Sequence, residues 1–329
     1  MRYTMNELAV CSNFLAAMKP APGMLSRYLV YLHSALYSSG AIRTAIKQTT
    51  GIQNVDLQDY LDQQVALPNF EEQKSISAYL DGETGRISQL IVEKQRLIAL
   101  LIEKRRALIT RAITQGLHRG TPLRDSGISW LGEIPGHWKI ERAKWLFVER
   151  DVRSESGDEV LLSVSHLTGV TSRAEKNVNM FMAESMEGYK RCEAGDLVIN
   201  TLWAWMGAMG VARQPGIVSP AYNVYQPAPE LDPDYVDLLV RTPRFAEEIT
   251  RYSKGVWSSR MRLYPEGLYE AWLPVPPKEE QQAIATHIKQ ETEKLDAFAQ
   301  ATERTIALLQ ERRSALISAA VTGQLVFEK

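Results

Sequence analysis

The sequence predicts an α+β protein in which globular domains are joined by two long, repeated helices that pair as an antiparallel coiled coil. Three observations indicate this fold. A stretch of roughly 50 residues occurs twice along the chain, both copies have the periodicity of a long helix, and the sequence between them mixes short β-type runs with a helix.

The repeat is the strongest of these observations. Residues 67–117 align with residues 275–325 at an offset of 208 residues without a gap, and 20 of the 51 aligned pairs are identical. The identical pairs include Glu71/Glu279, Glu72/Glu280, Gln73/Gln281, Ile98/Ile306, Leu101/Leu309, Arg105/Arg313, Leu108/Leu316 and Thr114/Thr322. Because chance identity would be far lower, we expect both stretches to adopt one structure.

Each copy has the features of one uninterrupted helix. Proline precedes each copy, at Pro68 and at Pro276 and Pro277, and glutamates occupy the first turn, where they complement the positive end of the helix dipole. Apolar residues then recur three and four positions apart. The residues predicted to pair are Ile87, Leu90, Leu97, Leu101 and Leu108 in the first copy and Leu295, Phe298, Ile306, Leu309 and Leu316 in the second.

The two helices are expected to pair with each other. A helix of roughly 40 residues is about 60 Å long and, with a narrow apolar stripe, is marginally stable alone. The other copy has matching length and period, and polar interruptions fall at the equivalent residues Lys94 and Thr302. The alternative is that each helix packs onto its own neighbouring domain.

The repeat divides the chain into four parts: a short N-terminal domain (1–66), a first long helix (67–120), a complete α+β domain (121–276) and a second long helix (277–329). Both domains end in a helix that begins near a tyrosine, a turn with Gly51 or Gly255, and a short segment into Leu-Pro. The repeating unit is therefore a domain plus a helix. The first domain is expected to be a truncated, C-terminal remnant.

Composition excludes little by itself. The net charge of −1 neither requires nor excludes a nucleic-acid partner, because local patches decide that binding. The two cysteines, Cys11 and Cys192, have no metal-ligand spacing, which predicts a reducing, cytoplasmic environment. We expect no signal peptide, no transmembrane helix and no membrane partner.

Motifs for catalysis are not found in the sequence. It contains no phosphate-binding loop of the GxxxxGK[ST] type, and its five histidines have no HExxH or CxxC companions, so no metal site is expected. Asp56 with Glu72 and Lys74 weakly imitates a nuclease pattern, but Gln282 replaces the lysine in the second copy. The chain is therefore predicted not to be an enzyme and to hold no cofactor.

The strongest candidate for binding double-stranded DNA is the basic segment 251–262. Arginine can bind guanine through two hydrogen bonds, lysine suits phosphate and serine suits either, and the segment has no acidic residue. Its candidate contacts are Arg251, Lys254, Trp257, Ser258, Ser259, Arg260 and Arg262. An ordinary solvated loop is the alternative.

Two further segments are candidates. Trp203 and Trp205 alternate as on one face of a strand and could contact thymine methyl groups or sugars, although a core position is the alternative. His166 and Thr168 lie in a polar segment that leaves a strand and could approach a groove, although a lone histidine is more often structural.

Five blocks in a fixed order carry a family resemblance. They are "WLGEIPGHWKIERAKWLF" at 130–147, "GDLVIN" at 195–200, "GIVSPAYNVYQP" at 216–227, "YSKGVWSSRMRLYPEGL" at 252–268 and "LPVPPKEEQ" at 273–281. With the domain–helix–domain–helix order, they resemble the specificity (S) subunit of Type I restriction–modification enzymes, here with a truncated first target-recognition domain.

The resemblance implies a division of labour. Each target-recognition domain reads half of a split DNA sequence, and the paired helices space the domains and dock methyltransferase (M) subunits. Those subunits use S-adenosylmethionine to methylate adenine, and restriction (R) subunits use ATP and Mg to cut unmodified DNA. The S subunit itself performs no chemistry.

The incomplete first domain leaves several arrangements open. One is a damaged product with a single working half-site. Another is a homodimer of half-subunits, in which two copies of the complete domain read a palindromic split site. A hypothesis of another class is a coiled-coil scaffold or regulatory partner of an intact specificity subunit, which would not read DNA.

Overall fold

The structure, a computed structural model, describes residues 15–49, 52–175, 185–255 and 261–325. The chain divides into a first unit, Met1–Leu100 with Ala297–Lys329, and a second unit, Leu101–Asp296. Each unit contains part of both long helices. Within the described residues, no helix is both long and apolar enough to cross a bilayer.

The two long helices are α3 (Phe70–Gln115) and α8 (Lys278–Val321). Glutamates fill the first turn of each, where they stabilise the positive end of the helix dipole. Gly116 and Gly323 follow the helices with φ of 71° and 73°, a left-handed conformation that glycine adopts without a steric penalty. The repeat therefore encodes the beginning of each helix, and each helix is followed by a glycine, although the two glycines are offset by one position in the alignment.

Each long helix buries one stripe of residues. Several of its members lie three or four positions apart, as in a coiled coil, and those nearest the start of each helix occupy equivalent positions in the two copies. The buried residues are Gln73, Ile76, Ser77, Leu80, Ile87, Ile91, Leu101, Ala112, Ile113 and Thr114 in α3 and Gln281, Ile284, Ala285, Ile288, Thr292, Thr302, Ala320 and Val321 in α8.

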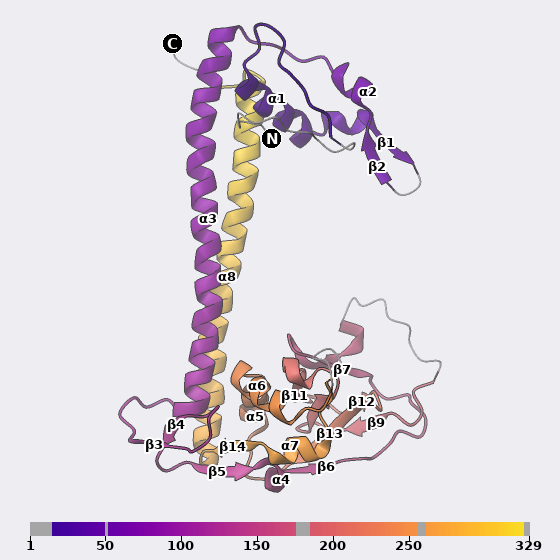
Figure 1. The fold of residues 1–329 in the computed structure, drawn as a ribbon, viewed down its shortest axis with the longest axis vertical. Helices are drawn as coiled ribbons and strands as arrows, with labels where there is room; N and C mark the ends of the chain where they lie inside the picture. The colour runs from indigo at the N-terminus through magenta and orange to yellow at the C-terminus, as the bar shows by residue number, and fades with distance from the viewer. Residues whose placement is uncertain (1–14, 50–51, 176–184, 256–260, 326–329) are drawn as a thin grey trace. The chain divides into compact units, whose positions relative to one another are not determined.

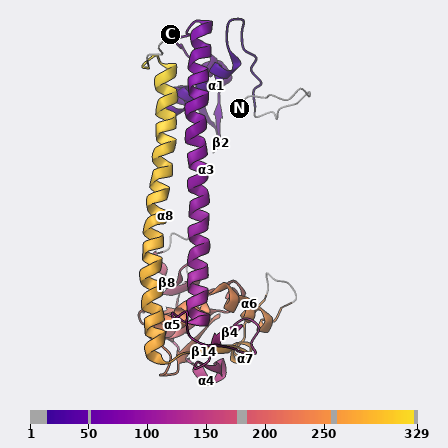
Figure 2. The same cartoon turned by 90° about the vertical axis from the view of Figure 1, so that its left-hand side faces the viewer.

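The helices pair in antiparallel orientation, as predicted. In the first unit, Arg313 Nη1 of α8 lies 3.4 Å from Ser88 Oγ of α3. In the second unit, Arg105 Nε of α3 lies 3.6 Å from Asp296 Oδ1 of α8. The two contacts join the same two positions of the repeat. With the offset of 208, Ser88 is equivalent to Asp296, and Arg105 is equivalent to Arg313. Figures 1 and 2 show the two helices side by side within each unit.

Two of the ten predicted pairing residues lie outside the buried stripe. Leu90 is 45% exposed and Phe298 is 52% exposed, and the two occupy the same position of the repeat. Ile87 and Ile91 are four residues apart and are both buried. Leu90, next to Ile91, therefore lies beside the buried stripe and not within it. Ile87 and Leu101 are buried, and Leu97, Leu108, Leu295, Ile306, Leu309 and Leu316 are half-buried.

The second unit is an antiparallel α+β domain. Its largest sheet has the strand order β11-β10-β13-β6, and the other strands form two-stranded ladders β12-β9, β14-β5, β3-β4 and β7-β8. The strands are β3 (Leu123–Asp125), β4 (Glu133–Pro135), β5 (Lys139–Arg142), β6 (Phe147–Glu149), β7 (Leu162–Ser165), β8 (Gly169–Ser172), β9 (Lys190–Cys192), β10 (Leu197–Asn200), β11 (Met209–Val211), β12 (Gly216–Val218), β13 (Tyr222–Pro227) and β14 (Trp272–Val275). The helices are α4 (Ala143–Leu146), η2 (Arg173–Glu175), η3 (Ala204–Met206), α5 (Pro233–Val240), α6 (Pro243–Tyr252) and α7 (Pro265–Glu270).

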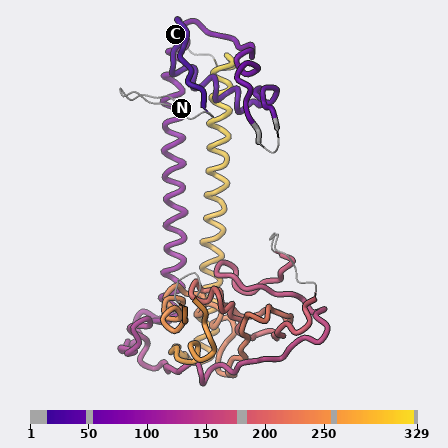
Figure 3. Tube along the Cα trace, turned by 45° about the vertical axis from the view of Figure 1, so that its right-hand side comes forward, coloured from indigo at the N-terminus to yellow at the C-terminus, as the bar shows by residue number. Residues whose placement is uncertain are grey.

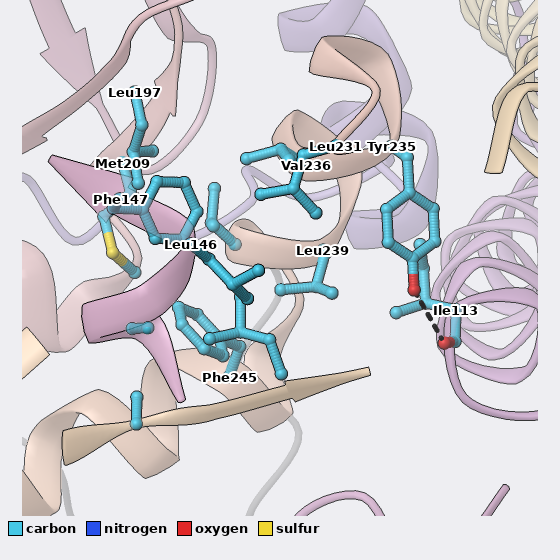
Figure 4. Packing of buried hydrophobic residues seen from close by; sticks show 14 of the residues in the cluster. Ile113, Leu146, Phe147, Leu197, Met209, Leu231, Tyr235, Val236, Leu239 and Phe245 are labelled. Carbon is cyan, nitrogen blue, oxygen red and sulfur yellow. Dashed lines mark hydrogen bonds between the residues drawn. The ribbon is translucent and has the colours of Figure 1, made fainter. Parts of the chain in front are cut away.

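One hydrophobic core joins this domain to the long helices (Figure 4). Phe147, Leu197 and Met209 come from the sheet side, and Leu239 and Phe245 from the helices. The hydroxyl of buried Tyr235 lies 3.5 Å from the carbonyl oxygen of Ile113 in α3. Burial raises the pKa of Tyr235 well above its ordinary value, so its hydroxyl remains a neutral donor.

A single glutamine fixes α5 to α8. Gln281 is fully buried, and its Oε1 accepts a hydrogen bond of 2.8 Å from the backbone N–H of Asp232. Its Nε2 donates to the carbonyl oxygens of Glu230, at 3.0 Å, and Pro276, at 2.9 Å. The amide thus satisfies three backbone groups near the start of both helices.

The first unit repeats this clamp. Its elements before α3 are α1 (Ser26–Ser38), η1 (Ala41–Ala45), β1 (Ile46–Thr49), β2 (Ile52–Val55) and α2 (Leu57–Leu61), which Figure 3 follows along the chain. Gln73 Oε1 accepts from Leu25 N–H at 2.8 Å, and its Nε2 donates to the oxygens of Gly23 and Pro68. The structural repeat therefore extends beyond the long helices.

We predict that Gln281→Ala destabilises the protein by about 1–3 kcal/mol, because it removes the three hydrogen bonds of a fully buried amide and leaves their backbone groups without this partner. The neighbouring Gln282→Ala, at an exposed position, is the control and should change the free energy of unfolding by less than about 0.5 kcal/mol. Urea unfolding of both variants measures the difference. Equal effects would show that the clamp does not hold α5.

The position of the stripe makes a second prediction. Leu80 is fully buried, so Leu80→Ala should lower the free energy of unfolding by about 2–5 kcal/mol, whereas Leu90→Ala should stay within about 0.5 kcal/mol. Thermal unfolding followed by circular dichroism compares the two. A larger loss for Leu90→Ala would place the packed face at the position expected from the sequence alone.

Candidate nucleic-acid interface

The tryptophan turn, defined here as residues 201–208, connects β10 to β11. Trp203 and Trp205 lie in this turn around the short helix η3, so the expectation that they alternate along a strand is wrong. Gly207, with φ of 84°, ends η3 and returns the chain toward β11. The two indole rings stack with centroids 6.2 Å apart and planes inclined by 24°.

The turn presents apolar side chains to solvent. Trp203 is 50% exposed, so it does not occupy the core position that was the alternative. Its neighbours Leu202 and Met206 are 40% and 37% exposed. The glycines at 207 and 210 are the sequence signal for a turn here, and spacing alone does not single out Leu202 or Met206. An exposed apolar cluster of this kind suits contact with sugars or base edges.

The basic segment begins at the end of α6. Arg251 Nη1 lies 3.1 Å from Glu248 Oε2 and 3.1 Å from Ser129 Oγ, so its guanidinium is engaged within the domain. Lys254 and Arg262 exchange two backbone hydrogen bonds of 2.9 Å and thereby close the loop between them. Both side chains are exposed, and neither forms an ion pair among the described residues. Four candidates, Trp257, Ser258, Ser259 and Arg260, lie outside the described residues.

The structure brings the basic segment and the tryptophan turn together. The N–H of Leu263, next to Arg262, donates to the carbonyl oxygen of Thr201 at 3.0 Å. Thr250 Oγ1, in the last turn of α6, lies 3.3 Å from the carbonyl oxygen of Trp205. Both ends of the basic segment are therefore bonded to the tryptophan turn. The bonded residues lie far apart in the chain, so no local sequence pattern predicts this arrangement.

The third candidate segment is the tip of the β7–β8 hairpin. His166 and Thr168 are exposed there, and Thr168 Oγ1 lies 2.8 Å from Ser165 Oγ. The hairpin packs closely on β11, because a Cβ added to Gly210 would lie 3.2 Å from Gly169 Cα. Arg241 Nη2 also donates to the carbonyl oxygen of Leu167 at 2.8 Å. The tryptophan turn thus bonds to both ends of the basic segment, whereas the β7–β8 hairpin packs on β11, the strand that follows the turn.

The described residues of the same domain show no reactive thiol and no metal cluster. Burial raises the pKa of the Cys192 thiol to about 12, so this thiol remains protonated near neutral pH and is a poor nucleophile. Among the described residues, no group of three or more His, Cys, Asp or Glu side chains is placed to hold a metal ion. The arrangement offers cations and aromatic surface, which are groups for binding.

Comparisons with known proteins identify the fold. No protein-family model matches the chain, and no curated protein matches its sequence. A chain from a structure of complex assembly and conformational transition in the type I R-M system matches with a TM-score of 0.66 and 17% identity, covering 91% of this chain and 71% of its own. The HsdS subunit from Thermoanaerobacter tengcongensis matches with a TM-score of 0.53 and 16% identity, over 91% and 70%. This chain therefore has the fold of an HsdS subunit of a type I restriction–modification system.

Proposed function

We propose that the chain is a DNA-recognition subunit of a Type I restriction–modification complex and that its second unit reads part of a split DNA target. The observation that carries the proposal is that the tryptophan turn bonds to both ends of the basic segment, while the β7–β8 hairpin packs on β11, the strand that follows the turn. The HsdS fold supports the same role.

The three segments offer two kinds of group, those that position the protein on the DNA backbone and those that read bases. Lys254 and Arg262 are exposed cations free of intramolecular ion pairs among the described residues, so they can neutralise phosphates or bind guanine. Trp203 and its apolar neighbours offer contact with thymine methyl groups or sugars. Arg251 differs from these, because its bonds to Glu248 and Ser129 give it a role in shaping the loop.

In this proposal the chain performs no catalysis and binds no cofactor. Methyltransferase subunits would bind S-adenosylmethionine, restriction subunits would bind ATP and Mg, and α3 and α8 would provide their docking scaffold. A homodimer that presents two copies of the second unit would read a palindromic split site. A scaffold that does not read DNA would have no use for the exposed cations and the half-exposed Trp203, and this favours the reading subunit.

We predict that Lys254→Glu combined with Arg262→Glu weakens binding of duplex DNA by about tenfold or more. The slope of log K against log salt should also become shallower, by about 0.9 for each phosphate that the variant no longer neutralises. Fluorescence anisotropy of the chain assembled with its methyltransferase subunits, over a salt series, measures both quantities.

The matched control reverses two exposed lysines that lie outside the long helices and the candidate segments, Lys139→Glu with Lys144→Glu. This variant carries the same change in net charge, so it separates a local contact from a general electrostatic effect. Equal losses in the two variants, or no loss in either, would contradict the placement of the DNA interface.

A further inference from the structure

Equivalent apolar residues have opposite exposure in the two units. Leu273 and Val275 of β14 are 2% and 9% exposed, whereas Val65 and Leu67, 208 residues earlier, are 40% and 50% exposed. The same contrast holds just before α2 of the first unit and α7 of the second. Val55, before α2, is 52% exposed, whereas the equivalent Leu263, before α7, is 2% exposed. The repeat therefore preserves an apolar face that only the second unit covers among the described residues.

In the second unit, the front half of the domain covers this face. β5 pairs antiparallel with β14, with Glu141 opposite Leu273 and Lys139 opposite Val275. The backbone N–H of Ala143 donates to Ala271 O at 2.8 Å, which extends the attachment beyond the ladder.

Side chains from the same region complete the cover. Trp130 Nε1 donates to the carbonyl oxygen of Trp272 at 3.2 Å. Trp130, Leu131, Leu146 and Phe147 belong to the same core cluster as Leu273. A strand and its flanking apolar residues, all within 130–147, thus close the face.

The first unit presents the open edge, defined here as residues 64–67 together with Val55, Leu57 and Leu61. Residues 64–67 are exposed and lie outside any helix or strand, and no strand pairs with them among the described residues. Leu57 and Leu61 of α2 are 47% and 55% exposed, and α2 has no buried residue. Position 66 is alanine where the second unit has Pro274, so the open edge has one more backbone donor.

We propose that the open edge is the docking site of a separate polypeptide that supplies an antiparallel strand flanked by apolar residues, with the chemistry of residues 130–147. Addition of a strand to an exposed edge provides backbone hydrogen bonds, and pockets for alternate side chains provide specificity. The proposal concerns the first unit and is independent of how the second unit reads DNA. A second intact copy is not the occupant, because its own β5 is already paired with β14.

The test uses the full chain and a fluorescein-labelled synthetic peptide with the sequence of residues 129–149. Val65→Lys with Leu67→Lys adds charge at the open edge, which opposes strand addition. Val92→Lys with Leu100→Lys, at positions 62% and 52% exposed on α3, is the matched control. All four side chains are exposed, so circular dichroism should show both variants folded.

We expect saturable binding of the peptide to the unaltered chain and to the control, with an affinity about tenfold or more lower for the open-edge variant. Three results would overturn the proposal. The first is the absence of saturable binding. The second is equal binding by both variants, which would place the peptide elsewhere. The third is binding that occurs only after deletion of residues 1–14, which would mean that the chain covers its own edge.

Discussion

The antiparallel packing of two copies of one helix is the constraint on which the other features depend. Because the copies are offset by 208 residues and run in opposite directions, one pair of repeat positions meets in both units, as Arg105 with Asp296 and Arg313 with Ser88 show. Each unit therefore receives the same pair of helix surfaces. A glutamine at the first turn, Gln73 or Gln281, then attaches the preceding helix through the same three hydrogen bonds.

The stripe between the helices combines apolar and polar residues, and the two classes have different effects. Thr292 and Thr302 are buried within it, and their hydroxyls bond to carbonyl oxygens of their own helix. Polar members contribute less stability than leucine would but restrict the register that the pair can adopt. The apolar clusters lie toward the helix ends, around Leu80 in the first unit and Ile113 in the second. The long helices thus pack on the attached elements near their ends, and the seam between them carries buried polar residues.

Much of this architecture could be predicted from the sequence, because a repeat with heptad spacing carries its own evidence for paired helices. The stripe itself was harder to place, since Leu90 and Ile91 are adjacent and only packing decides which one faces inward. The alternation of Trp203 and Trp205 is typical of a strand, but Gly207 in a left-handed conformation makes a turn. The attachment of Leu263 to Thr201 joins residues far apart in the chain, and no local pattern predicts it.

Methylation mapping tests the central claim most directly. The chain would be expressed in cells with its methyltransferase subunits, and N6-methyladenine would be located across the genome. We predict methylation within a split motif; a palindromic motif would indicate a dimer of half-subunits, and two unlike halves would show that the first unit also reads DNA. A soluble, assembled complex that methylates no motif would contradict the account and would favour a scaffold that does not read DNA.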